Sequence, residues 1–180
     1  MRLAEWLSLT DREQAEGQSR MTISEWQYGV ATREQIAGRT GREVMQAIID
    51  GALPQPPICQ LMTFHLVEIG DGRAVFEGES GKHLLNPAGG VHGGWALTLI
   101  DSATGCAAYT TLPADTPYTT VETKANFSRP IMHDTGLVRC EAHVVSRGRR
   151  IISCESHLRS ADGRLLAHGT STLMVLGDTG

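Results

Sequence analysis

The sequence predicts an α+β domain in which an antiparallel sheet wraps one long central helix. Three observations support this architecture: a strand hairpin in the first half of the chain, further strand-like runs in the second half, and an almost wholly apolar helical segment between them. With 180 residues, 41% of them hydrophobic, the chain is long enough to bury one sizeable core. A second globular domain is therefore not required.

The N-terminal part reads as helix and connector. Residues 1–39 are polar and weakly periodic, so we expect an N-terminal extension that is partly helical or poorly ordered, with little structure before Trp26. Met21 is an alternative start of the natural chain. The clearest helix covers residues 40–49 and opens the main domain, which we place at residues 40–180.

Strand-like runs follow in two groups. Residues 60–69 and 73–80 are joined at Gly70-Asp71-Gly72, a turn sequence typical of a β-hairpin. Late in the chain, turn residues separate further runs that we expect to be antiparallel neighbours. These later runs are residues 118–127, 137–146, 149–159 and 164–176.

The segment between the two strand groups, residues 93–109, reads GGWALTLIDSATGCAAY. Its apolar residues surround nearly the whole helical circumference, which is typical of a buried rather than an amphipathic helix. Its small residues would let neighbouring backbone come close. We therefore expect the sheet to wrap this helix.

One acidic residue, Asp101, stands in the middle of this apolar helix. Burying an isolated carboxylate is costly unless the group is paired, hydrogen-bonded or neutralised. No basic residue lies one helical turn away from it. The position favours a functional carboxylate, and the alternative is a structural one that is satisfied by Thr98, Thr104 or a distant Arg.

A glycine-rich loop precedes the helix and reads Asn86-Pro87-Ala88-Gly89-Gly90-Val91-His92-Gly93-Gly94. Unpaired N–H groups at a helix N-terminus suit a carbonyl oxygen that gains negative charge, so an oxyanion hole can be built here. The alternative is a tight connector without a catalytic role. His92 would orient the loop or a substrate carbonyl, or satisfy a backbone carbonyl; acid/base catalysis by His92 is a weaker alternative.

Charge and hydropathy argue against several classes of protein. The 16 Lys and Arg against 20 Asp and Glu give a net charge of −4, so we expect no binding of nucleic acid through overall charge. No apolar stretch approaches the roughly 20 residues that cross a bilayer, and the N-terminus lacks the layout of a secretory signal. We expect a cytoplasmic protein that does not bind membranes.

The sequence carries no motif for a metal or another cofactor. The four cysteines lack the spacings of structural zinc sites, and we expect reduced, partly buried thiols. HExxH, Walker A and the GxSxG of serine esterases are also absent. We therefore expect no metal and no cofactor.

Taken together, these residues resemble the hot-dog acyl-CoA thioesterases of the PaaI (phenylacetic-acid-degradation) type. Asn86, the His92-Gly93-Gly94 run and Asp101 have the spacing of that family, and the strand at residues 119–130 ends in its Phe-x-Arg-Pro pattern. The resemblance covers residues 40–176.

The resemblance implies a hot-dog fold, in which a strongly curved antiparallel sheet wraps the long helix. It also implies hydrolysis of an acyl-CoA to free acid and CoA by a homodimer with composite sites, commonly paired into a homotetramer. Aryl-acetyl, benzoyl-like and medium-chain acyl groups all stay open as substrates.

The resemblance further implies roles for individual residues. Asp101 matches the carboxylate that activates water as a general base or attacks the thioester itself. The Gly93 or Gly94 backbone N–H of a neighbouring subunit matches the donor that polarises the thioester carbonyl. Asn86 matches the amide that helps to hold the acyl group or the loop.

Hydroxyl and basic side chains complete the predicted site. Thr120 matches the hydroxyl that helps to orient the water, with Thr119 as the alternative because strand alternation points only one of them to the site. Arg147 and Arg149 would grip CoA phosphates, since guanidinium matches phosphate, and Arg129 would do the same. The alternative for these arginines is a solvated surface role.

Two other functions stay open. A hot-dog hydratase or dehydratase would use His92 together with Asp101, although both lie here in the order of the thioesterases. A non-catalytic acyl-CoA sensor would keep the binding groove and regulate a partner, typically through an attached DNA-binding module. Residues 1–39 are too short and too weakly periodic for a convincing helix-turn-helix.

Overall fold

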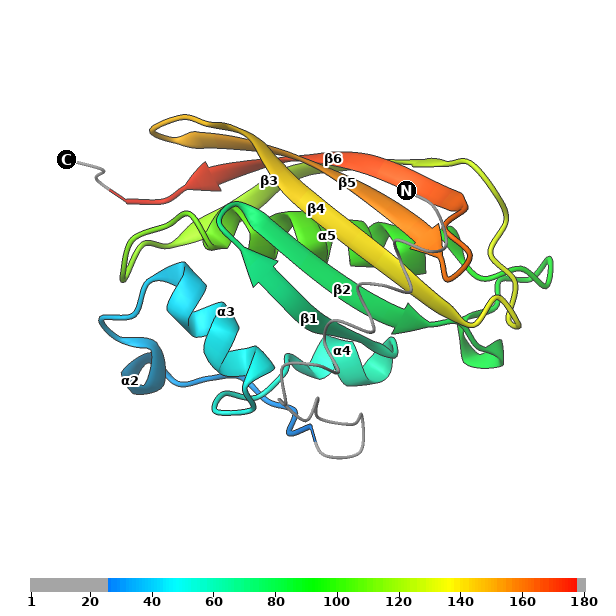
Figure 1. The fold of residues 1–180 in the computed structure, drawn as a ribbon, viewed down its shortest axis with the longest axis horizontal. Helices are drawn as coiled ribbons and strands as arrows, with labels where there is room; N and C mark the ends of the chain where they lie inside the picture. Colours follow the sequence, from blue (N-terminus) through cyan, green and yellow to red (C-terminus); the bar gives the residue numbers. More distant parts are fainter. Residues whose placement is uncertain (1–25, 178–180) are drawn as a thin grey trace.

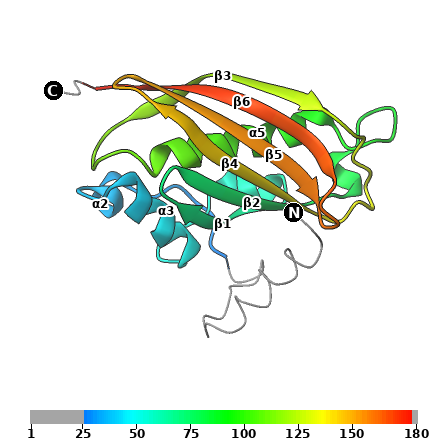
Figure 2. The same ribbon diagram turned by 45° about the horizontal axis from the view of Figure 1, so that its top comes forward.

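The computed structural model describes residues 26–177 of the chain. Within these residues six strands form one antiparallel sheet that wraps the long helix α5 (Gly93–Tyr109), as Figures 1 and 2 show. This is the hot-dog arrangement that the sequence predicts. The strands are β1 (Phe64–Gly70), β2 (Arg73–Glu79), β3 (Tyr118–Phe127), β4 (Leu137–Arg147), β5 (Ile151–Ser160) and β6 (Leu165–Val175).

The sheet has the strand order β1-β2-β4-β5-β6-β3, so β1 and β3 form its two edges. Every neighbouring pair is antiparallel, as predicted. The β1–β2 turn contains Gly72 at φ +63°, a conformation that glycine adopts without steric cost. The short helices α2 (Arg33–Ile36) and α3 (Gly41–Ile49) lie on the β1 side of the molecule (Figure 1).

Helix α5 approaches the sheet closely because glycines face it from two strands. A Cβ atom at Gly78 of β2 would lie 3.0 Å from Trp95, and one at Gly169 of β6 would lie 2.8 Å from Ile100. Trp95, Leu99 and Ile100 are almost completely buried between the helix and the strands. Helix and sheet therefore share one core.

The N-terminal end of α3 is fixed by a capping box. The Thr40 hydroxyl accepts a hydrogen bond from the Glu43 N–H at 3.3 Å, and the Glu43 carboxylate accepts one from the Thr40 N–H at 2.7 Å. Val44, Ala47 and Ile48 of this helix are buried, on the face that the sequence predicts.

The first strand begins later than the sequence predicts. Gln60 and Leu61, assigned to a strand from the pattern, belong instead to the helix α4 (Pro57–Leu61), and β1 starts only at Phe64. Pro57 explains the difference, because proline is favoured in the first turn of a helix. The remaining predicted strands agree with β2 to β6 to within two residues.

The N-terminal extension is described only in part. Residues 26–39 contain α2 and a bridge between Tyr28 and Gln55. The expectations for residues 1–25, including a start at Met21, fall outside the described residues, and the domain boundary at residue 40 stays a prediction. No helix of residues 26–177 combines the length and the apolar character that crossing a membrane requires.

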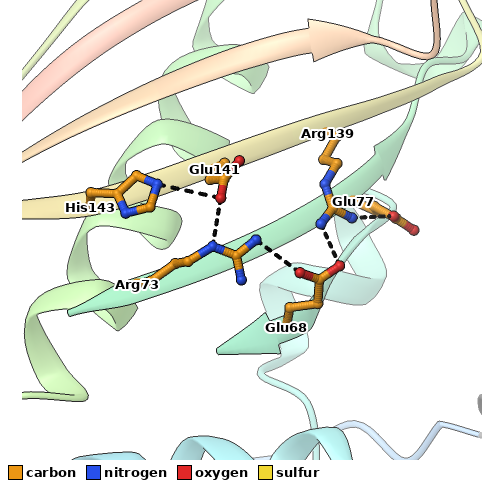
Figure 3. A network of polar contacts seen from close by, with 6 residues as sticks. All are labelled: Glu68, Arg73, Glu77, Arg139, Glu141 and His143. Atoms are coloured by element: carbon orange, nitrogen blue, oxygen red, sulfur yellow. Dashed lines mark hydrogen bonds and ion pairs between the residues drawn. The ribbon is translucent and has the colours of Figure 1, made fainter. Parts of the chain in front are cut away.

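A network of ion pairs covers the sheet face that points away from α5 (Figure 3). Its central member is Glu68, whose carboxylate contacts both Arg73, at 2.9 Å, and Arg139. The side chains of Glu68 and Arg139 are only 24% and 20% exposed. The network, called the outer-face network below, consists of Glu68 of β1, Arg73 and Glu77 of β2, and Arg139, Glu141 and His143 of β4.

Candidate active site

Helix α5 is buried over most of its surface but keeps one half-buried side. The residues on this side recur every three to four positions, which places them on one helical face. The sequence predicts burial all round, and the residues of this chain between 26 and 177 leave this side only partly covered. The side, called the α5 stripe below, consists of Gly94, Leu97, Thr98, Asp101, Ser102, Cys106 and Tyr109.

Strand β3 runs alongside α5 in the opposite direction. Three close approaches along the helix define this arrangement, from its first turn to its fourth. They are Phe127 over Gly93, Thr123 against Asp101, and the Tyr118 hydroxyl near Gly105. Strand β3 therefore contributes to the same surface as the Asp101 carboxylate.

The Asp101 carboxylate is half-buried and is held by a hydroxyl. The Thr123 Oγ1–H donates to Oδ1 of Asp101 at 2.8 Å. The hydroxyls of Thr98 and Thr104, the partners considered from the sequence, do not bond the carboxylate. That of Thr98 reaches the Gly94 carbonyl, and that of Thr104 has as acceptors the backbone carbonyls of Ile100 and Asp101 and the Ser171 hydroxyl. Among residues 26–177, no Lys, Arg or His forms an ion pair with Asp101.

The hydroxyl that contacts Asp101 belongs to Thr123, a residue that the sequence reasoning does not single out. Strand β3 has a β-bulge between Thr120 and Glu122, with Val121 as the extra residue. The bulge shifts the alternation by one position, so Thr123 faces the helix together with Thr120, while Thr119 is exposed. Sequence alternation alone cannot locate a bulge, and for this reason it does not point to Thr123.

The first residue of α5 has a backbone N–H without an acceptor among residues 26–177. His92 is the N-cap, and its Nδ1 accepts a hydrogen bond from the Gly94 N–H at 2.8 Å, so the contact assigns the ring proton to Nε2. Of the two predicted donors, Gly94 is therefore occupied. The Gly93 N–H has no acceptor within residues 26–177, as expected for the first turn of a helix.

The Gly93 N–H and the Asp101 carboxylate of one chain are too far apart to act on one carbonyl group. Eight residues separate them along the helix, which corresponds to about 12 Å at 1.5 Å per residue. A nucleophile and an oxyanion donor must both lie about 3 Å from the reacting group. A site that uses both groups therefore requires a second copy of the chain.

Asn86 organises the loop before α5. Its Oδ1 accepts hydrogen bonds from the Ala88 N–H at 2.9 Å and the Gly90 N–H at 3.3 Å, and its own backbone N–H donates to the Gly90 carbonyl at 2.8 Å. These contacts match the loop-holding alternative of the two predicted roles.

The three predicted phosphate-binding arginines do not converge within one chain. Arg147 and Arg149 lie at the exposed tip of the β4–β5 hairpin, at the same end of the sheet as the start of β3 but with β6 between them. Arg129 follows the other end of β3 and donates to the Leu165 carbonyl at 2.8 Å. Ten residues of strand, about 33 Å, separate the two ends.

Cysteine and tyrosine side chains beside Asp101 are protonated at neutral pH. Burial raises the pKa of the Cys106 thiol to about 12, with smaller contributions from Cys59 and Asp101. Burial also raises the pKa of Tyr118 well above its ordinary value of 10. All four cysteines are free thiols, and Cys106 is too weakly acidic to serve as the nucleophile.

Comparison with known proteins places this geometry in a family. The family model described as the thioesterase superfamily matches residues 88–167, from the glycine loop to β6. The solved structure of the conserved protein PA5202 from Pseudomonas aeruginosa is similar, with 30% sequence identity, a TM-score of 0.63, and coverage of 81% of this chain and 100% of that chain. The chain belongs to the thioesterase superfamily and has its hot-dog fold.

Two further proteins are similar to this chain over about two thirds of its length. The phenylacetic acid degradation protein PaaI from Thermus thermophilus, solved as a mutant, shares 27% identity and a TM-score of 0.61 over 67% of this chain and 99% of that chain. A Saccharolobus solfataricus protein that is named as a candidate esterase is 29% identical over 119 residues, which cover 66% of this chain and 83% of its own length.

Proposed function

We propose that this protein is an acyl-CoA thioesterase, which hydrolyses an aryl- or medium-chain acyl-CoA to free acid and CoA. The observation that carries the proposal is the half-buried Asp101 carboxylate on the α5 stripe, held by the Thr123 hydroxyl in a superfamily of thioesterases. The likeness to PaaI supports an aryl-acetyl or related acyl group.

Asp101 has two routes to the products. As a general base, its carboxylate takes a proton from water while the water oxygen attacks the thioester carbon; the C–S bond then breaks and the sulfur of CoA leaves and takes up a proton. As a nucleophile, a carboxylate oxygen attacks the same carbon, CoA leaves as the thiolate, and water hydrolyses the resulting anhydride. Both routes place negative charge on the carbonyl oxygen.

The Gly93 N–H of a second copy stabilises that oxygen. It lies at the positive end of the α5 dipole and has no acceptor within residues 26–177. A donor of this kind in a site screened from water contributes about 10²–10³ to the rate constant. Asp101 of one subunit and Gly93 of its partner thus form one composite site.

The surface that a second copy would cover is continuous. Strand β3 is a ten-residue edge strand. It adjoins the α5 stripe through Thr123 and the start of α5 through Phe127. Val121 and Phe127 of this strand are 58% and 57% exposed. Long exposed edge strands invite pairing with another chain, so we place the homodimer interface here, with pairing of dimers into a homotetramer as the larger assembly.

The remaining predicted residues support the reaction indirectly. Thr120 faces the same side as Thr123 and orients the attacking water, while His92 and Asn86 fix the loop that presents Gly93. Because Arg129 and the Arg147–Arg149 tip lie at opposite ends of β3, only the assembled dimer decides which of them contacts CoA phosphates.

The test measures CoA release with a thiol reagent from a panel of aryl- and straight-chain acyl-CoAs. We expect turnover by the parent protein and a loss of about 10²–10⁴ in kcat for Asp101→Asn, which keeps the shape of the side chain but removes the base. Asp71→Asn, in the exposed β1–β2 turn, is the matched control and keeps parent activity. Binding of acyl-CoA without turnover by the parent protein would replace the proposal by a sensor function.

A further inference from the structure

We infer that a buried chain of three hydroxyls, Thr104–Ser171–Thr123, fixes the orientation of the Asp101 carboxylate and thereby selects the oxygen that acts on the substrate. The inference rests on the proposed function, because it concerns the same carboxylate. Thr104 and Ser171 do not reach the α5 stripe, so they are positioning residues rather than catalytic ones.

The three hydroxyls form a continuous hydrogen-bonded path. Thr104 Oγ1 lies 2.7 Å from Ser171 Oγ, Ser171 Oγ lies 3.0 Å from Thr123 Oγ1, and Thr123 Oγ1 lies 2.8 Å from Oδ1 of Asp101. Thr104 is 0% exposed and Ser171 is 2% exposed. The hydroxyls come from three different elements, α5, β6 and β3. The hydroxyl chain therefore links the helix to both strands.

The carboxylate dictates the direction of the two hydrogen bonds nearest to it. An ionised carboxylate only accepts, so Thr123 must donate its single hydrogen to Asp101. The Thr123 oxygen is then free to accept from Ser171, and Ser171 in turn accepts from Thr104. The Thr104 hydroxyl also has the backbone carbonyls of Ile100 and Asp101 as acceptors, at 2.9 and 3.1 Å, but Ser171 is its nearest acceptor at 2.7 Å. When Thr104 donates to Ser171, all three O–H groups point toward the negative charge, and each bond polarises the next one.

This arrangement distinguishes the two oxygens of Asp101. Oδ1 is engaged by Thr123, which leaves Oδ2 as the oxygen that meets water or the thioester carbon. Thr123 alone would be free to rotate, but Ser171 and Thr104 hold its hydroxyl from the buried side. Loss of the hydroxyl chain should therefore lower the rate of the chemical step and leave substrate binding unchanged.

The neighbouring strand provides a matched control. Ser156 of β5 is 1% exposed and pairs with Gly169 of β6, two residues from Ser171. Its hydroxyl has no hydrogen-bond partner among the described residues. Replacing Ser156 by Ala removes a serine Oγ from an equally buried place and leaves the hydroxyl chain intact.

The kinetic test compares Ser171→Ala, Ser171→Thr and Ser156→Ala with the parent protein on the best acyl-CoA of the panel. We expect kcat to fall about tenfold in Ser171→Ala with KM unchanged, as for the loss of about one hydrogen bond. Ser156→Ala keeps the parent kcat, and Ser171→Thr, which retains a hydroxyl, restores most of it. Thr104→Val breaks the chain at its far end and serves if Ser171→Ala does not fold.

A second readout does not depend on catalysis. The carboxylate stretching bands of Asp101 are identified in the infrared difference between the parent protein and Asp101→Asn. We expect these bands to shift in Ser171→Ala and not in Ser156→Ala, whether or not the protein hydrolyses thioesters. Unshifted bands, or equal kcat values in Ser171→Ala and Ser156→Ala, would overturn the inference; shifted bands in a protein without thioesterase activity would overturn the proposed function alone.

Discussion

The outer face of the sheet and the helix on its inner side each carry a partly buried carboxylate, and the two carboxylates have opposite surroundings. On the outer face, Glu68 is clamped between Arg73 and Arg139 within a network of opposite charges (Figure 3). On the helix side, Asp101 accepts a hydrogen bond from Thr123, and no cation of residues 26–177 neutralises it. Both carboxylates are partly buried, so burial alone does not separate them.

Under the proposed function, the difference separates polar groups that serve stability from polar groups that serve chemistry. A carboxylate that is saturated by guanidinium groups is a poor base, because its lone pairs and its charge are already engaged. Asp101 and the Gly93 N–H keep a free lone pair and a free donor, which is costly for folding and useful for catalysis. The largest effects on activity should therefore come from α5, and the largest effects of charge on stability from the outer-face network.

The sharpest test on the helix side compares two substitutions at Gly93. Gly93→Pro removes the backbone N–H but is compatible with the first helical position, and the preceding His92 is already extended at φ −61° and ψ 131°. We expect kcat to fall by about 10²–10³, the value of one oxyanion donor. Steady-state kinetics on the best acyl-CoA measure this loss.

Gly93→Ala is the control for that substitution. It keeps the N–H and adds a Cβ that would lie 3.0 Å from the Phe127 ring, which is exposed enough to move. Its kcat should stay within a few fold of the parent value. Equal losses in the two variants would show that the contact with Phe127, and not the loss of the N–H, lowers kcat.

The next test compares what the carboxylates of Glu68 and Asp101 contribute to stability. Glu68→Gln removes one carboxylate partner from each of two partly buried guanidinium groups, Arg73 and Arg139, which keep only Glu141 and Glu77. We expect the substitution to lower the free energy of unfolding by about 2 kcal/mol. Asp101→Asn removes a charge that has no such partner, and it should leave stability equal or slightly higher. Urea unfolding of both variants beside the parent decides this, and a larger loss in Asp101→Asn would contradict the comparison.

The outer-face network should also make stability depend on pH. Burial by itself raises the pKa of Glu68, but the hydrogen bonds and charges of Arg139 and Arg73 outweigh it and hold the pKa below its ordinary value of 4.5. Because the pKa is lower in the folded state, the stabilisation is present above pH 4.5 and is lost as the pH falls below that value. The stability difference between the parent and Glu68→Gln should shrink over this range, whereas a constant difference would count against the ion pairs as its source.

The smallest expected effect lies at the rim of the network. His143 contacts Glu141 at 3.3 Å, but the two side chains are 49% and 36% exposed. Ion pairs of this exposure contribute little, so His143→Ala should change the free energy of unfolding by less than about 0.5 kcal/mol. A change near that of Glu68→Gln would mean that the network acts as one cooperative unit.

Local patterns in the sequence predict most of the fold. Turn residues mark the hairpin, and residue patterns mark the late strands and the apolar α5 segment. The structure confirms each of these elements. The part that fails, the strand predicted from Gln60, depends on a choice between helix and strand in a short run, where Pro57 decides for a helix. Periodicity cannot decide so short a segment.

The candidate site is less accessible to sequence reasoning because it depends on contacts between distant elements. Asp101 stands out as an acid in an apolar helix, and Gly93 as a glycine at a helix start. The contact of Thr123 with Asp101 depends on the bulge at Val121, and that of Ser171 on the register of β6 against β3, neither of which the composition of a strand reveals. The proposed share of a partner subunit in the site depends on a dimer interface, which the sequence of one chain does not reveal.

The most direct test of the composite site mixes two inactive variants. Asp101→Asn and Gly93→Pro are combined in equal amounts under conditions that let subunits exchange, and CoA release is followed against each variant alone. If Asp101 of one subunit works with Gly93 of the other, half of the dimers are mixed and each contains one intact site, so about a quarter of the parent activity should return. A mixture that exchanges subunits and still shows no gain in activity would contradict the composite site.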